Sequence, residues 1–262
     1  RGGPHPRGHG RHHAKARVMA EPDVADEICR LVGNLPLAIS IAGSYLAYRP
    51  YRSLTVFCDQ LKEQMKPLDL AEDDQRIRET FELSWKHLDE TPSRIFALLG
   101  LFAGRSFSLN AIAKIYQMDP YLMEDKLEEL VTLSLLSKQD DARYRQHSLL
   151  ASFAKEKLAG DRTAIERYIT YFASFARQFA TIYTVLNPEW GNLDAAIKYA
   201  EETQRWELVL QFTAVLKDAW FARGRFQHAR EAFETAFQAA IRLEDEPLLA
   251  QNWLWWGKAC LE

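Results

Sequence analysis

The strongest constraint on the fold lies in the second half of the chain, where apolar residues recur every three or four positions. Between residues 165 and 182 they form an almost unbroken stripe, made of Ile165, Tyr168, Ile169, Phe172, Phe175, Ala176, Phe179 and Ile182. This spacing places them on one face of an amphipathic helix. The same pattern predicts further helices near residues 192–203, 206–222, 226–243 and 247–261. Consecutive amphipathic helices joined by short turns predict a helical-repeat array over residues 161–262.

Part of this array matches a tetratricopeptide repeat. The turn and second helix of one such repeat correspond to Gly224, Phe226, Ala229, Phe233 and Ala236. Trp253 and Gly257 would begin the next repeat, and we expect the array to continue in a longer parent protein.

The last expected helix carries three tryptophans. Trp253 and Trp256 are three positions apart and share a face, whereas Trp255 points elsewhere. The face with Trp253 and Trp256 either packs between repeats or forms a surface for a partner.

Residues 71–160 predict a winged-helix domain. After an amphipathic helix near 75–88, a second helix would start at Thr91-Pro92 and a third would be capped by Ser108. A fourth would run from about residue 121 to 133, with an inward face made of Leu122, Leu127, Leu130 and Val131.

A change of period follows these helices. Residues 135–147 form two short segments around a polar Asp140-Asp141 turn, which predicts a β-hairpin. Ser148 would then cap a further helix through Leu158. The expected fold class is therefore mainly α: a helical segment, a winged helix with a small hairpin, and a helical-repeat array.

One stretch lacks charge and needs a separate explanation. The segment ICRLVGNLPLAISIAGSYLA covers residues 28–47, and no charged residue occurs from Leu31 to Tyr48. A membrane-spanning helix needs about 20 mostly apolar residues, whereas Gly33, Asn34 and Pro36 interrupt this run. We interpret it as helix, bend and helix, with Pro36 in the first turn of the second helix. No membrane-spanning segment is expected.

The charge is distributed unevenly. Residues 1–20 hold five Arg/Lys, four of the seven histidines and no acid, so the net charge of −3 leaves about −8 for the rest. That balance disfavours broad non-specific binding to nucleic acid. We expect residues 1–20 to be a disordered or artificially added tail, because Gly and Pro alternate with other residues there. Its histidines, His5, His9, His12 and His13, are at most a weak metal site.

Three isolated cysteines, Cys29, Cys58 and Cys260, show neither a disulfide framework nor the spacing of a zinc site. A reducing compartment, the cytoplasm, is the expected location.

Three motifs in order resemble a known family. Residues 28–46 resemble the "GLPL" segment of the NB-ARC (AP-ATPase) branch of multidomain signal-transduction NTPases. Residues 144–150, YRQHSLL, resemble the "MHD" segment of that family, and residues 192–197, NLDAAI, resemble the start of the helical region in bacterial members with tetratricopeptide sensors. On this resemblance, residues 21–70 are an incomplete NB-ARC segment, followed by the winged helix (71–160) and the repeats (161–262).

The resemblance implies roles for two residues. Pro36 would pack beside the adenine of ADP, and His147 would donate a hydrogen bond to its β-phosphate. A plain structural role is the alternative for each: a helix-start proline and a capped loop histidine. The implied cofactor is ADP or ATP held by the parent protein, with none bound tightly by this chain alone. The implied partners are an upstream P-loop core in the same protein and a protein or small ligand that the repeats sense.

The sequence departs from the family in two ways. Ser148 stands where the family has Asp, and it keeps the capping capacity without the charge. The chain also lacks a G-x-x-x-x-G-K-[ST] phosphate loop and an acidic strand end for magnesium before Pro36. We therefore expect no enzymatic activity from this chain by itself.

Two other functions remain open. One is a DNA-binding winged-helix regulator that reads DNA with residues 121–133, although YLMEDKLEELVTL holds one lysine against four acids. The other is a tetratricopeptide scaffold for protein interaction, without coupling to a nucleotide.

Overall fold

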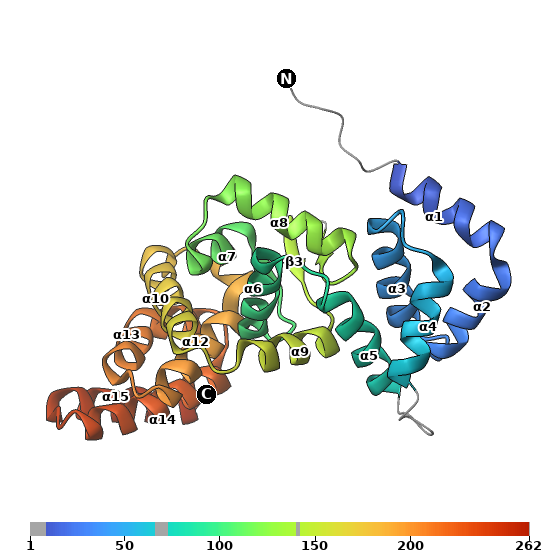
Figure 1. Cartoon of the computed structure of the whole chain (residues 1–262). Coiled ribbons are helices and arrows are strands. Elements are labelled where there is room, and N and C mark those ends of the chain that lie inside the picture. The colour runs from blue at the N-terminus through green and yellow to red at the C-terminus, as the bar shows by residue number, and fades with distance from the viewer. Residues whose placement is uncertain (1–8, 66–72, 140–141, 262) are drawn as a thin grey trace.

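The structure is a computed structural model that describes the backbone of residues 9–65, 73–139 and 142–261. It is almost entirely helical, with one small antiparallel sheet, which confirms the predicted mainly α fold. Figure 1 shows three blocks in a row along the chain: residues 9–65 at one end, residues 73–158 in the middle, and the last helices at the other end.

The first block contains a helix where a disordered tail was expected. Its elements are α1 (His9–Ala20), α2 (Pro22–Leu31), α3 (Pro36–Tyr48) and α4 (Leu54–Met65). Arg17 of α1 donates to the carbonyls of Leu46, Arg49 and Arg52, at the end of α3 and just beyond it. The expected disorder was wrong for residues 9–20, because the prolines and most glycines lie before His9 and because packing on α3 offsets a weak propensity. The alternative, an artificially added tail, stays a prediction. His5 lies outside the described residues, and so do the side chains of His9, His12 and His13.

The uncharged stretch folds as helix, bend and helix, as predicted. Gly33 (φ +71°) and Asn34 (φ +56°) are left-handed, Leu35 is the N-cap, and Pro36 is the first residue of α3. The buried face of α3 consists of Ala38, Ile41, Ala42, Tyr45 and Leu46. Among the described residues, no helix combines the length and the apolar character needed to cross a membrane.

The middle block has the element order of a winged helix. Its elements are α5 (Asp73–Trp85), α6 (Glu90–Leu98), the 3₁₀ turn η1 (Leu99–Phe102), β1 (Phe107–Ser108), α7 (Leu109–Tyr116), α8 (Pro120–Thr132), β2 (Ser137–Lys138), β3 (Arg143–Arg145) and α9 (Ser148–Leu158). Ser108 caps α7 as predicted, by accepting from the N–H of Ala111. The N-cap position of α6 is Asp89 and not Thr91, so this helix begins before the expected residue.

The predicted hairpin is part of a three-stranded sheet with the strand order β1-β3-β2. Tyr144 of β3 pairs with Phe107 of β1 and with Lys138 of β2. The sequence analysis missed β1, because a two-residue strand is too short to show a period. Gly100 allows η1 to lie directly on α9, since a Cβ there would come within 2.5 Å of the backbone nitrogen of Lys155.

The third block begins with the long helix predicted from the apolar stripe. Its elements are α10 (Arg162–Phe179), α11 (Tyr183–Leu186), the 3₁₀ turn η2 (Asn187–Glu189), α12 (Trp190–Glu202), α13 (Trp206–Ala222), α14 (Phe226–Arg242) and α15 (Glu246–Leu261). α10 packs against α7 of the winged helix and against α12 and α13, whereas α14 packs between α13 and α15.

The turns of the array repeat the same geometry. A left-handed residue ends each of α12, α13 and α14, namely Gln204, Gly224 and Glu244. In each turn the next N–H bonds back to the carbonyl five residues earlier, as in a Schellman motif. α13, α14 and α15 begin at Trp206, Phe226 and Glu246, at intervals of 20 residues. A two-helix unit of about 40 residues is longer than the 34 residues of a tetratricopeptide repeat.

Candidate functional site

His147 lies at the exit of the wing, between β3 and α9. It is exposed, and its Nδ1 accepts a hydrogen bond from the backbone N–H of Leu149 at 3.3 Å. His147 is therefore the N-cap of α9, and the expected cap, Ser148, is instead the first helical residue. Because Nδ1 accepts, a neutral imidazole carries its proton on Nε2. No partner of Nε2 is recorded within the described part of the chain, so this N–H is available to an external acceptor.

The residue before His147 is buried although its side-chain amide has no recorded hydrogen-bond partner. Gln146 is only 2% exposed, and neither its Oε1 nor its Nε2 has a hydrogen-bond partner among the described residues. An unsatisfied buried amide is unfavourable by about 1–3 kcal/mol. The wing exit is therefore held by the packing around it and not by the side-chain polar groups of Gln146.

Pro36 occupies the other predicted position, at the exposed start of α3. Its N-cap residue, Leu35, provides no side-chain capping bond. Arg76 of α5 packs against the bend that precedes α3. Its Nη1 donates to the Leu31 carbonyl at 2.7 Å, and a Cβ on Gly33 would lie 2.8 Å from its Cδ. The bend thus combines an uncapped helix start with a nearby cation, and both features favour the binding of an anion.

The two predicted residues lie on separate blocks. Figure 1 shows α5 between α3 and α9. Neither Pro36 nor His147 lines the pocket beside Tyr48 or the groove beside α10. α5 packs on both sides. It contacts α3 and α4 of the first block, and within the middle block its Phe81 stacks on Phe96 of α6 at 5.0 Å and on Phe153 of α9 at 5.5 Å.

A second link joins α3 to α8. Tyr48 donates its hydroxyl proton to Glu129 at 2.9 Å, and the hydroxyls of Ser44 and Ser134 are 2.7 Å apart. We call these four residues the α3–α8 seam. Burial, and then the bond to Glu129, raise the pKa of Tyr48 to about 12, although the residue remains 41% exposed.

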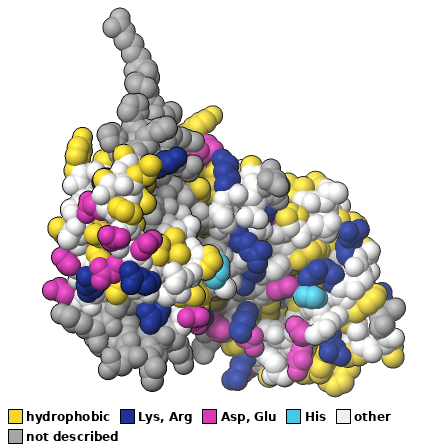
Figure 2. Space-filling view, turned by 90° about the vertical axis from the view of Figure 1, so that its right-hand side faces the viewer, with side chains coloured by type: hydrophobic (Ala, Val, Ile, Leu, Met, Phe, Trp, Pro, Cys, Tyr) yellow, Lys and Arg dark blue, Asp and Glu magenta, His cyan; other side chains and the backbone are white. Residues whose placement is uncertain are grey.

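Two further acids of α8 have a cationic partner, and Glu129 has a second partner. Lys138 of the wing lies 3.6 Å from Glu124 and 4.0 Å from Glu128, and Lys126 lies 3.2 Å from Glu129. The helix that would read DNA thus faces α3 and the wing with carboxylates. Elsewhere, Figure 2 shows lysine and arginine side chains interspersed with aspartate and glutamate over one face of the molecule.

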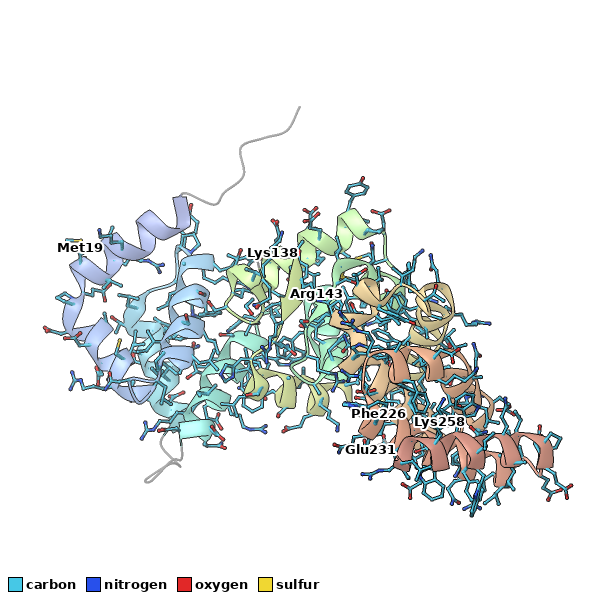
Figure 3. The ribbon with its side chains drawn as sticks, turned by 180° about the vertical axis from the view of Figure 1, so that it is seen from behind. Met19, Lys138, Arg143, Phe226, Glu231 and Lys258 are labelled. Atoms are coloured by element: carbon cyan, nitrogen blue, oxygen red, sulfur yellow. The ribbon has the colours of Figure 1, made fainter. Side chains whose placement is uncertain are left out.

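The winged helix meets the repeats through a buried polar network, in which Figure 3 labels Arg143. Arg143 of β3 and Glu189 form an ion pair of 2.6 Å, with side chains only 10% and 5% exposed. Arg143 also donates to the hydroxyl and the carbonyl of Ser106. Asn192 donates to the Ser106 carbonyl at 2.9 Å and to Glu189 at 2.7 Å. We call these four residues the repeat-side seam.

Sequence reasoning missed this seam. Asn192 was noted within a motif but received no role, and nothing in a single sequence pairs Arg143 with a glutamate 46 positions later. The sequence feature that could have indicated the seam is Glu189, an acid that directly precedes Trp190 at the start of a helix.

The predicted tryptophan face exists on α15. Trp253 and Trp256 lie 6.1 Å apart and both contact Phe237 of α14, at 5.2 Å and 6.0 Å between ring centroids. Trp255 points elsewhere, toward Phe221 at 5.8 Å. Trp253 is 59% exposed, and its role as a partner surface stays a prediction.

Two proteins with curated descriptions are similar to this chain, while no protein-family model matches it. Regulatory protein AfsR of Streptomyces griseus is 34% identical over 180 residues, which are 66% of this chain and 18% of that protein. Regulatory protein AfsR of Streptomyces coelicolor is 39% identical over 140 residues, which are 53% of this chain and 14% of that protein. The chain therefore spans less than a fifth of the length of the curated relatives it matches.

Proposed function

We propose that this chain is the regulatory part of a larger signal-transduction NTPase. Its winged helix would contact ADP held by a P-loop core of the same parent protein, and its helical repeats would receive a signal from a protein or a small ligand. The likeness to two regulatory proteins supports the general role, and the GLPL-like and MHD-like segments support the nucleotide contact.

The observation that carries this proposal is the state of His147. A histidine that served only as a cap would need no more than its Nδ1 acceptor, which Leu149 uses. Here the imidazole is also exposed, with its Nε2–H available at the start of α9. A phosphate at that position would receive this donor and benefit from the positive end of the helix.

The repeat-side seam suggests how a signal would travel. The buried ion pair of Arg143 and Glu189 holds the wing to η2, next to α12. A movement of the repeats would therefore carry the winged helix with it and withdraw His147 from the nucleotide.

The test compares two substitutions of His147 in a protein that includes the P-loop core, with ADP affinity measured by calorimetry. His147→Ala removes both the cap and the donor, whereas His147→Asn keeps a good N-cap and loses the outward donor. A hydrogen bond to a charged group is worth about 1.5–3 kcal/mol, so both variants should bind ADP roughly 10- to 150-fold more weakly. Wild-type affinity in His147→Asn would reduce the histidine to a helix cap.

The same protein distinguishes the alternative functions. We expect weak, salt-sensitive binding of duplex DNA at most, because α8 holds four acidic residues and one lysine. Sub-micromolar, sequence-selective binding by the winged helix would favour a DNA-binding regulator. An ADP affinity that no substitution at the wing exit alters would favour a plain interaction scaffold.

A further inference from the structure

A large groove lies where the winged helix meets the first long helix of the repeats. Its volume is about 950 Å³, and its walls come from α7, α10 and the segment of α11 and η2. The Arg143–Glu189 pair of the repeat-side seam forms part of its lining. Binding pockets for small molecules commonly have volumes of about 300–1,000 Å³ and often lie between domains.

One wall of the groove is a ladder of aromatic rings on α10. Tyr171, Phe175 and Phe179 follow each other at intervals of one helical turn and are all half-buried. The ring centroids of Tyr171 and Phe175 are 6.2 Å apart, and those of Phe175 and Phe179 are 4.8 Å apart. This wall offers a planar or aliphatic ligand a continuous apolar surface.

The charges in the groove are unbalanced. Both acids of the lining have cationic partners, since Glu166 lies 2.7 Å from Arg205 and Glu189 lies 2.6 Å from Arg143. Lys114 of α7 and Arg167 of α10 also line the groove, and neither has an ion pair within the described part of the chain. The groove thus presents two cations without partners beside an apolar wall.

From this combination we propose that the groove binds a small amphipathic anion. The ligand would have an aromatic or aliphatic body that lies on Tyr171, Phe175 and Phe179, and a carboxylate, sulfonate or phosphate that meets Lys114 and Arg167. A bound anion contacts both α7 and α10, so it ties the winged helix to the repeats. This inference does not depend on the proposed nucleotide contact.

The test uses two fluorescent probes with similar aromatic bodies. 8-Anilinonaphthalene-1-sulfonate carries an anionic group, whereas N-phenyl-1-naphthylamine does not. The sulfonate should bind the chain saturably at one site, and its affinity should fall as salt is raised. Arg167→Gln and Lys114→Gln should each weaken its binding by about tenfold, since each removes a charge-assisted hydrogen bond. Binding of the neutral probe should remain unchanged in both variants.

Arg177→Gln is the matched control, because it removes the same charge from an exposed position of α10 that does not line the groove. It should bind both probes as the wild type does. Phe175→Ala should weaken the binding of both probes, because it removes the centre of the aromatic wall. Equal binding of the sulfonate by the wild type, Arg167→Gln and Lys114→Gln overturns the proposal, and so does an equal loss in Arg177→Gln.

Discussion

The winged helix has a different kind of contact on each of its two sides. At the α3–α8 seam, two hydrogen bonds join side chains that are partly exposed. At the repeat-side seam, an ion pair and several hydrogen bonds are buried. Removing one partner of a buried ion pair strongly lowers the stability of the fold, whereas an exposed polar contact contributes little to that stability. We infer that the winged helix and the repeats move as one body, and that the molecule would open at the α3–α8 seam while α5 stays packed on α3.

The largest expected effect comes from breaking the buried pair. Arg143→Ala leaves the Glu189 carboxylate buried without its cation, which should lower the free energy of unfolding by about 3–5 kcal/mol in urea titrations. Arg205→Ala is the control, because the pair with Glu166 is 52% and 39% exposed and should contribute about 0–1 kcal/mol. A similar loss in both variants would remove the distinction between the two sides of the winged helix.

Two rings of the apolar stripe sharpen the comparison. Phe172 is fully buried and lies 6.5 Å from Phe102 of η1, whereas Phe175 is half-buried beside the groove. Phe172→Ala should lower the free energy of unfolding by about 3–5 kcal/mol. Phe175→Ala should lower it by about 1–2 kcal/mol, since less apolar area leaves water there on folding. Chemical denaturation of both variants provides the measurement, and equal losses would mean that the groove is closed in solution.

The smallest effect is expected at the α3–α8 seam. Tyr48→Phe removes one partly exposed hydrogen bond and should lower the free energy of unfolding by about 0.5–1.5 kcal/mol at neutral pH. Tyr51→Phe, at a fully exposed position, should change nothing. A loss as large as that of Arg143→Ala would show that the two seams are equally strong.

The same tyrosine gives the seam a pH dependence. Burial raises the pKa of Tyr48 to about 12, and a tyrosine in an unfolded chain titrates near 10. Above about pH 10 the unfolded chain loses this proton first, so the stability contributed by Tyr48 is complete below pH 10 and is lost between pH 10 and 12. Thermal unfolding at pH 9 and pH 11 should show a smaller decrease for Tyr48→Phe than for the wild type.

Much of the helical framework was predictable because its signals are local. The bend at Gly33 and Asn34 needed left-handed backbone, and Pro36 fitted the first turn of a helix. The predictions of secondary structure failed where a contact with a residue distant in sequence determines the local structure. α1 forms against α3 although its own propensity is weak, and β1 exists because Tyr144 pairs with Phe107.

The sequence alone determined the helical periods, the bend before α3 and the position of the wing, because each depends on residues within a few positions of one another. Only the tertiary structure decided that His147 and not Ser148 caps α9, and that Arg143 meets Glu189 in a buried pair. It also decided that Lys114 and Arg167 share one groove with an aromatic wall. These facts depend on which elements pack together, and a buried charge is stable only where another part of the chain supplies its partner.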